Sequence, residues 1–228
     1  MISTSAFAEN IYSDSICGYK LNDITFPSKG EVEHDVDGAC FNGKNITKYI
    51  SDGGEITSAT FNKVADVFYY TVYKGTTAGY DDIVVMSVAY KKGGIYASAL
   101  FDTKSEPHAK KPEDETTGLT VTWYDDRNST LYLSANAWMT SNSVRAMKFS
   151  DNYSNKVLSQ KFFTDGDIQF ITEKGLSISQ IGHDSKGAFF PAYLYGRDGK
   201  KICQLDTRET LWAVDQPCLD EGVALKER

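Results

Sequence analysis

The sequence lacks a long apolar run, a basic cluster and every common catalytic signature. Its 228 residues carry 24 Lys+Arg against 31 Asp+Glu, a formal net charge of −7. Proteins that bind nucleic acid neutralise phosphates with clustered Lys and Arg, so this class is excluded. No apolar run approaches the roughly 20 residues of a membrane-spanning helix. The signatures H-E-x-x-H, G-x-S-x-G, G-x-G-x-x-G and the P-loop are all missing. We therefore predict a protein that is not an enzyme and uses no cofactor.

Cysteine is scarce, and its four positions are informative. None lies in a C-x-x-C motif, which excludes a zinc ribbon and a thioredoxin-type redox site, and we predict no metal site. Four cysteines permit three pairings, of which we predict the two local ones, Cys17–Cys40 and Cys203–Cys218. Each disulfide would stabilise its end of the chain by about 3 kcal/mol. Such pairs indicate export to an oxidising compartment; four buried free thiols in the cytosol are the alternative.

The first residues resemble the end of a secretory signal. Ala6-Phe7-Ala8 followed by the charged Glu9 matches the pattern that signal peptidase cleaves. We interpret residues 1–8 as a signal-peptide remnant and expect the mature protein to begin near Glu9, in the periplasm or outside the cell. An ordinary Ser/Ala-rich terminus is the alternative reading.

Strand patterns dominate the rest of the chain. The 41% hydrophobic content, with 14 Tyr and 12 Phe, excludes disorder for most of it. Apolar and polar residues alternate in Leu119–Tyr124 and Leu176–Ser179, as in half-buried strands. The runs Val67–Tyr73 and Ile83–Tyr90 are rich in Val, Ile and Tyr, which is typical of strands covered on both faces. Helical periodicity is hard to find, so the sequence predicts an all-β fold.

These strands form a weak repeat. Each unit reads strand, polar turn, strand, polar turn, strand, and the units run over Val67–Asp102, Leu119–Asp151 and Leu176–Asp206. Such repeats predict antiparallel meanders, propeller-like, with about four blade-like units. A β-sandwich or barrel remains the alternative architecture.

Further elements are predicted in the gaps between the units and at the ends of the chain. A further strand fits around Phe162 and another at Asp167–Thr172, and residues 36–61 would hold a degenerate first unit. We predict a single all-β domain over residues 9–218 and a C-terminal tail, or a short helix, over residues 219–228.

Two groups of residues are candidates for partner contacts. Residues 103–118 contain two prolines, many charges and almost nothing to bury, which indicates a solvated linker or a partner-contacting loop. Its candidate contacts are Glu106, His108, Glu113 and Asp114. The second group lies in Asp-rich turns. Turns favour Asp because its side chain hydrogen-bonds the local backbone, but these carboxylates would also contact a partner or serve glycoside hydrolysis. The group comprises Asp81, Asp82, Asp125 and Asp126.

The class and compartment together lead to a functional hypothesis. An exported, acidic, all-β domain without a catalytic motif is expected to bind a protein, and its charge complements a basic partner. We predict an inhibitor or immunity protein that occludes the active site of a secreted antibacterial toxin or cell-wall-degrading enzyme. One alternative is a carbohydrate-binding module or glycosidase on a propeller scaffold, with Trp123, Trp138 or Trp212 as platforms. Another is a structural or assembly protein of the cell envelope.

Overall fold

The computed structural model describes residues 24–27, 34–77, 80–105, 117–138, 141–184, 187–205 and 218. Within these ranges the chain folds almost entirely into antiparallel strands, so the all-β prediction is confirmed. The described helices are α1 (Thr47–Ser51) and the 3-10 turn η3 (Thr103–Ser105).

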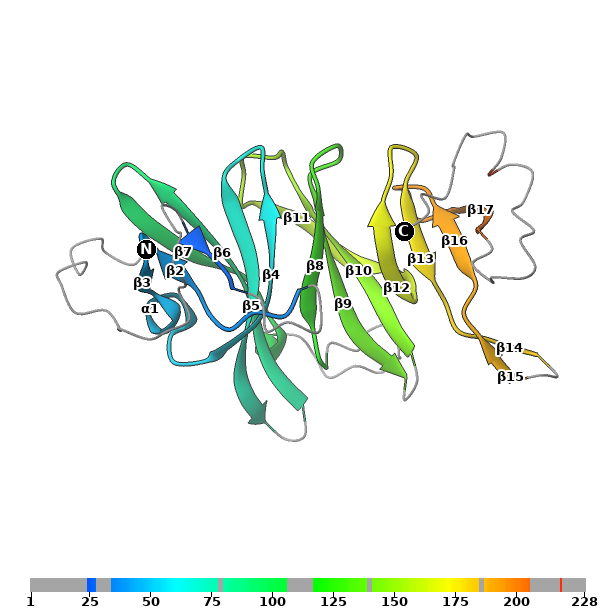
Figure 1. Ribbon diagram of the computed structural model, residues 1–228, viewed down its shortest axis with the longest axis horizontal. Helices are drawn as coiled ribbons and strands as arrows, with labels where there is room; N and C mark the ends of the chain where they lie inside the picture. Colours follow the sequence, from blue (N-terminus) through cyan, green and yellow to red (C-terminus); the bar gives the residue numbers. More distant parts are fainter. Residues whose placement is uncertain are drawn as a thin grey trace.

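Three four-stranded meanders make up most of the fold (Figure 1). The first sheet consists of β4 (Glu55–Asn62), β5 (Val67–Thr77), β6 (Tyr80–Lys91) and β7 (Gly94–Asp102). The second sheet consists of β8 (Thr120–Asp125), β9 (Thr130–Trp138), β10 (Ser141–Phe149) and β11 (Val157–Asp165). The third sheet consists of β12 (Asp167–Ile171), β13 (Leu176–Ser179), β16 (Ala192–Tyr195) and β17 (Lys201–Leu205).

Two smaller sheets accompany the meanders. The N-terminal sheet is formed by β1 (Ile24–Thr25), β2 (Cys40–Phe41) and β3 (Lys44–Asn45). Between β13 and β16 the chain makes a separate two-stranded hairpin of β14 (Gly182–Asp184) and β15 (Gly187–Phe189). We call this element the β14–β15 hairpin.

The predicted repeat matches these meanders closely. Each predicted unit contains three strands of one sheet, and the strands expected in the gaps are present as β11 and β12. The predicted degenerate unit at residues 36–61 is divided, because β2, β3 and α1 belong to the N-terminal end whereas β4 opens the first sheet. The turn Lys91–Gly94 joins β6 to β7, and its central residues Lys92 and Gly93 have φ values of 51° and 76°, as a tight hairpin turn of the I′ type requires.

Both faces of the first and second sheets are buried, because the sheets stack on one another. Leu131 of β9 packs with Tyr69 of β5 between the first and second sheets, and both are almost fully buried. The next residue along β9, Tyr132, points the other way and packs against the third sheet. Likewise Tyr70 faces the N-terminal elements. This arrangement explains the nearly continuous apolar runs, since alternate residues enter different cores.

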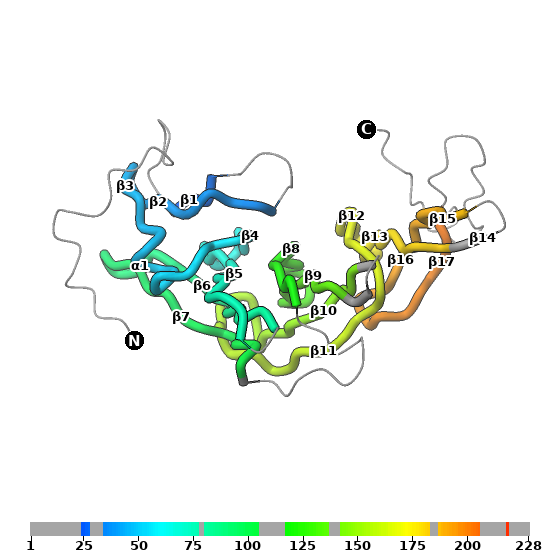
Figure 2. The backbone as a smooth tube through the Cα atoms, turned by 90° about the horizontal axis from the view of Figure 1, so that it is seen from below, coloured from blue at the N-terminus to red at the C-terminus, as the bar shows by residue number. Residues whose placement is uncertain are grey.

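The stacked sheets form an open row (Figures 1 and 2). Their first strands lie along one side, where β8 contacts both β4 and β12. Among the described strands, those at the two edges of each sheet do not pair with one another, and the N-terminal and third sheets stand at opposite ends of the row. The units are therefore blade-like meanders, but within the described residues they close into neither a propeller ring nor a barrel.

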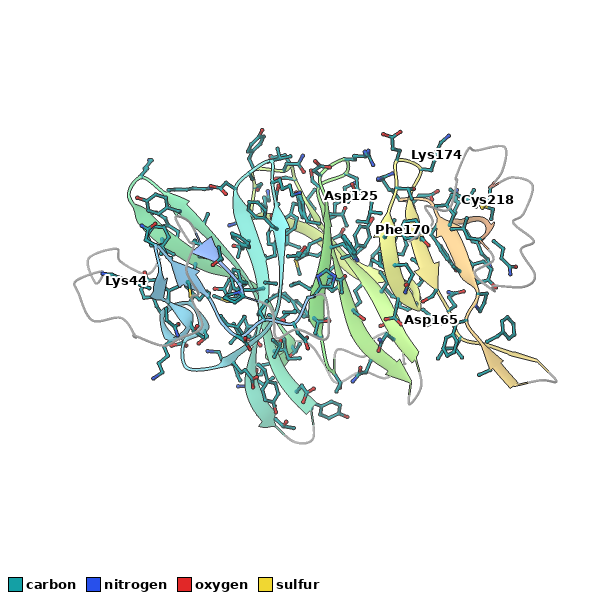
Figure 3. The ribbon with its side chains drawn as sticks, in the orientation of Figure 1. Lys44, Asp125, Asp165, Phe170, Lys174 and Cys218 are labelled. Atoms are coloured by element: carbon teal, nitrogen blue, oxygen red, sulfur yellow. A yellow bond between two sulfur atoms is a disulfide. The ribbon has the colours of Figure 1, made fainter. Side chains whose placement is uncertain are left out.

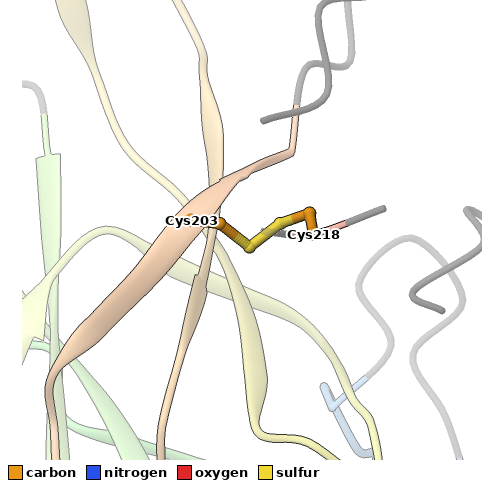
Figure 4. Close-up of a disulfide and its surroundings, with 2 residues drawn as sticks. All are labelled: Cys203 and Cys218. Atoms are coloured by element: carbon orange, nitrogen blue, oxygen red, sulfur yellow. A yellow bond between two sulfur atoms is a disulfide. The ribbon is translucent and has the colours of Figure 1, made fainter. Parts of the chain in front are cut away.

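A disulfide covers the far face of the third sheet. Cys203 of β17 is bonded to Cys218, with Cα atoms 5.7 Å apart, and both side chains are buried against Leu194 and Leu205 (Figure 4). This confirms one predicted pair. Cys40 is also disulfide-bonded, but Cys17 lies outside the described residues, so that pairing stays a prediction. The predicted segments 1–8 and 219–228 are likewise outside, and the domain boundaries stay predictions.

Candidate functional site

The aspartates predicted to contact a partner include one pair near the start of β6. Asp82 is buried and forms a salt bridge with Lys104, whose pKa this hydrogen bond raises. The half-buried Asp81 accepts the backbone N–H of Gly118 at 3.0 Å. It also accepts the hydroxyl of Thr76 at 3.4 Å. These contacts hold the chain that enters β8 against the first sheet.

The second pair of aspartates lies at the end of β8. Asp125 is 3% exposed and accepts the Nε–H of Arg197 at 2.6 Å (Figure 3). The same guanidinium donates to the backbone carbonyls of Thr172 and Glu173 at 2.9 and 2.8 Å. Asp125 therefore joins the second sheet to the third sheet. Its neighbour Asp126 is exposed.

Among the described residues, the structure does not bring the two predicted aspartate pairs together. Asp81 accepts a hydrogen bond from Gly118, just before β8, whereas Asp125 is the last residue of β8. The two pairs therefore lie at opposite ends of that strand. Asp82 and Asp125 direct their carboxylates into internal ion pairs, which favours a structural role. The other candidates lie outside the described residues: Glu106, His108, Glu113 and Asp114. Partner contact by any member of the set stays a prediction.

Of the tryptophans proposed as sugar platforms, the structure describes the side chain of Trp123. Trp123 is partly buried between the second and third sheets, and the edge of its ring meets His34 at a centroid distance of 5.3 Å. Trp138 ends β9, and Trp212 lies outside the described residues. The carbohydrate alternative thus gains no assembled aromatic platform from the described part of the chain.

The β14–β15 hairpin is where the third sheet departs from the repeat. β13 and β16 pair directly, from Leu176↔Tyr195 to Ser179↔Ala192, so a short turn would suffice to connect them. The chain instead extends into the hairpin, which forms its own two-stranded sheet and projects from the end of the row (Figure 1). An insertion that leaves the pairing of its flanking strands intact is not required for the fold, which makes it a candidate for function.

Close packing of a ring on a glycine stiffens the base of this hairpin. Gly182 pairs with Phe189, and a Cβ at Gly182 would lie 2.5 Å from the Cζ of that ring. The phenyl ring therefore covers the glycine backbone, an arrangement that any larger residue would disturb. Phe190 follows directly and is 61% exposed. The hairpin presents a large apolar side chain to solvent beside a fixed backbone.

A second candidate is a pocket of about 240 Å³ on the side of the row where the first strands meet. Residues of the first and second sheets, of β12 and of the segment before β2 line it. We call this the inner pocket. No sequence pattern indicates this pocket, because its walls come from four distant segments.

The comparisons with known proteins leave the function open. No protein-family model, curated protein or solved structure matches the chain. In the part of the chain that the structure describes, no helix has the length and apolar character needed to cross a membrane. The same residues contain no group of three or more His, Cys, Asp or Glu side chains placed to hold a metal ion.

Proposed function

We propose that this chain is an exported protein-binding domain without catalytic activity of its own. It inhibits a secreted toxin or cell-wall-degrading enzyme by inserting the β14–β15 hairpin into the active-site cleft of that enzyme. The observation that carries this proposal is the hairpin itself, an insertion in an otherwise regular meander that projects from the row of sheets (Figure 1). A narrow projecting element fits a concave cleft, where a flat sheet face does not.

The base of the hairpin is held in place from both sides. The backbone N–H of Gln180 donates to the carbonyl of Pro191 at 2.9 Å, which extends the pairing of β13 and β16 towards the hairpin. The adjoining strand β17 carries the buried Cys203–Cys218 disulfide. A binding element that is already ordered loses less conformational entropy on binding, and this supports tight inhibition.

Phe190 supplies the anchor for such a complex. Its side chain is 61% exposed although it is large and apolar. An aromatic ring buries on the order of 150–250 Å² when it enters a pocket, and aromatic anchors of this kind dominate interface energies. Burial of this ring in the partner would therefore be a main source of affinity.

Charge and compartment agree with the same proposal. The net charge of −7 would accelerate encounter with a basic enzyme, and this steering weakens as salt increases. The Cys203–Cys218 disulfide is typical of a protein that works in an oxidising space such as the periplasm. Secreted toxins and wall-degrading enzymes are encountered in that space.

The test replaces the hairpin with the turn that the repeat would use. In the variant, residues 181–190 give way to Asn-Gly, so that Gln180 and Pro191 flank a two-residue hairpin turn. Both proteins are assayed against a panel of purified basic wall hydrolases: a lysozyme-like muramidase, an amidase and an endopeptidase. We expect the natural chain to inhibit at least one enzyme stoichiometrically and the variant to inhibit it at least about 100-fold more weakly.

Two controls make the result decisive. Circular dichroism and the thermal midpoint of the shortened variant should stay close to those of the natural chain, because the paired strands of the third sheet are untouched. Inhibition of none of the enzymes, or equal inhibition by the natural and shortened proteins, would overturn the proposal.

A further inference from the structure

The inner pocket is a preformed cavity and does not involve the hairpin. Residues of β4, β8 and β12 are among those that line it. These strands lie along the same side of the row (Figure 2). The wall from β4 is fixed by Ser58, whose hydroxyl accepts the backbone N–H of Val121 at 2.9 Å. The wall from β12 is fixed by the backbone N–H of Gly166, which donates to the carbonyl of Asn142 at 2.8 Å. The cavity is therefore built into the junction of the sheets.

Its lining combines an apolar part with acidic groups. Ile168 supplies accessible apolar surface, and Leu133 and Val144, which are almost fully buried, lie directly beneath the lining. Asp35 and Asp167 supply two carboxylates, and no Lys or Arg is among the lining residues. Apart from His34, the lining offers no side chain that can carry a positive charge, so a carboxylate or phosphate entering the cavity would meet like charge with no Lys or Arg to offset it.

The two carboxylates are held at the cavity by backbone and side-chain contacts. Asp35 pairs with Ser58 in an isolated β-bridge, next to the hydrogen bond from the backbone N–H of Ala59 to the carbonyl of His34 at 3.1 Å. Asp167 accepts the side-chain amide of Asn142 through Oδ1 at 2.8 Å. This single bond orients the carboxylate and leaves acceptor capacity on it, since an ionised carboxylate has two oxygens with several lone pairs.

We infer that the inner pocket binds an aliphatic cation, an alkylammonium or alkylguanidinium group of the kind that a lysine or arginine side chain carries. The methylene stem packs on the apolar surface of Ile168, while the cationic head is hydrogen-bonded by Asp35 and Asp167. Both parts are needed, because the stem removes apolar surface from water and the charge-assisted bonds give the selectivity.

The inference is tested by NMR titration of the full chain with n-butylammonium and n-butylguanidinium. Neutral n-butanol and anionic butyrate are the matched controls. We expect saturable amide shifts for Thr120, Thr122, Val144 and Ile168 with a Kd on the order of 1 mM, as suits a ligand of so few atoms. The neutral and anionic controls should produce no saturable shifts there, and higher salt should weaken the binding of both cations.

Three variants locate the cation within the pocket. Asp167→Asn, at an exposed residue, should preserve the fold and weaken butylammonium binding about tenfold, and Asp35→Asn should do the same. Asp198→Asn removes an exposed carboxylate in the β16–β17 turn and should leave binding unchanged. Equal binding of butanol and butylammonium, or an equal loss in Asp198→Asn and Asp167→Asn, would overturn the inference.

A final comparison distinguishes a protein side chain from a free amine as the source of the cation. N-acetyl-lysine amide and N-acetyl-arginine amide carry the side chain together with a peptide-like backbone. Binding of either at least as tight as that of butylammonium would support the side chain of a protein as the occupant. Exclusion of both, with butylammonium still bound, would reject that source and leave a free amine as the occupant.

Discussion

The second and third sheets are both four-stranded meanders, yet they differ in regularity and in covering. The second sheet runs through β8–β11 without interruption and has a neighbouring sheet on each face. The third sheet is interrupted by the β14–β15 hairpin, and its far face is covered by the disulfide-linked Cys218 among the described residues. The regular sheets supply the buried contacts between units, whereas the departure from the repeat is the element to which the proposed function assigns recognition.

The ends of a stacked array need a cap, because the last sheet has only one neighbour. At the third sheet the Cys203–Cys218 crosslink performs this role. The crosslink stabilises this end of the row because it ties the buried Cys218 to β17.

The largest expected effect is on the core of the second sheet. Leu131→Ala removes a side chain with 0% exposure that packs between the first and second sheets, and should lower the free energy of unfolding by about 4 kcal/mol. Leu158→Ala in the same sheet removes a side chain that is 55% exposed and should change it by less than about 0.5 kcal/mol. Denaturant unfolding of both variants measures this difference, and equal values would contradict the stacked arrangement.

Removal of the disulfide that caps the third sheet should have the next largest effect on stability, and this effect should be more local. The 15-residue separation of the disulfide predicts a loss of about 3 kcal/mol in the double variant Cys203→Ser/Cys218→Ser. Native-state hydrogen exchange should show reduced protection in β16 and β17, with little change in β5 and β6 of the first sheet. A uniform loss of protection across all three sheets would show that the third sheet is not a separately capped unit.

The ion pair between the two sheets should matter less. Arg197→Ala leaves Asp125 buried without its cation and should cost about 2 kcal/mol, less than a fully buried pair because the Arg197 side chain is 19% exposed. Adding Asp125→Asn removes the stranded charge, so the double variant should be more stable than Arg197→Ala alone. Thermal unfolding of the single and double variants measures this coupling, and simple additivity of the two losses would argue against the ion pair.

Alkaline pH should cause the smallest of these decreases in the free energy of unfolding. Burial raises the pKa of Tyr132 above its ordinary value of 10.0 in the folded protein, so the folded state holds this proton more tightly than the unfolded state. The contribution of Tyr132 to the free energy of unfolding should therefore be fully present below pH 10.0 and should decrease as the pH rises above it. Denaturant unfolding at several alkaline pH values should show a shallower decline for Tyr132→Phe, and an identical slope would contradict this assignment.

Periodicity and turn chemistry predicted much of the fold because they are local properties. Alternation in Leu119–Tyr124 and the polar turn after Tyr90 correspond to β8 and to the β6–β7 turn. The direction of stacking depends on which sheet each face meets, and no local pattern contains that information. Closure of a ring depends on accumulated rotation between sheets, which explains why blade-like units were predictable but the open row was not.

The candidate sites were harder to predict for a related reason. Asp82 and Asp125 have the same local context as exposed turn aspartates, and their burial comes from Lys104 and from Arg197 in other segments. The inner pocket is assembled from His34, from the first and second sheets and from β12, so no single motif indicates it. The hairpin gave one usable signal, the polar turn Asp184–Gly187 within the third predicted unit.

The most direct test of the division between scaffold and recognition element uses two exposed aromatic residues. Phe190→Ala alters the hairpin exit in the third sheet, and Tyr153→Ala alters the β10–β11 connection of the second sheet, where Tyr153 is 70% exposed. The inhibition constant of each variant is measured against a wall hydrolase that the natural chain is found to inhibit in the assay proposed above. The account predicts at least about tenfold weaker inhibition for Phe190→Ala and no change for Tyr153→Ala. Unchanged inhibition by Phe190→Ala, or an equal loss in both variants, would contradict it.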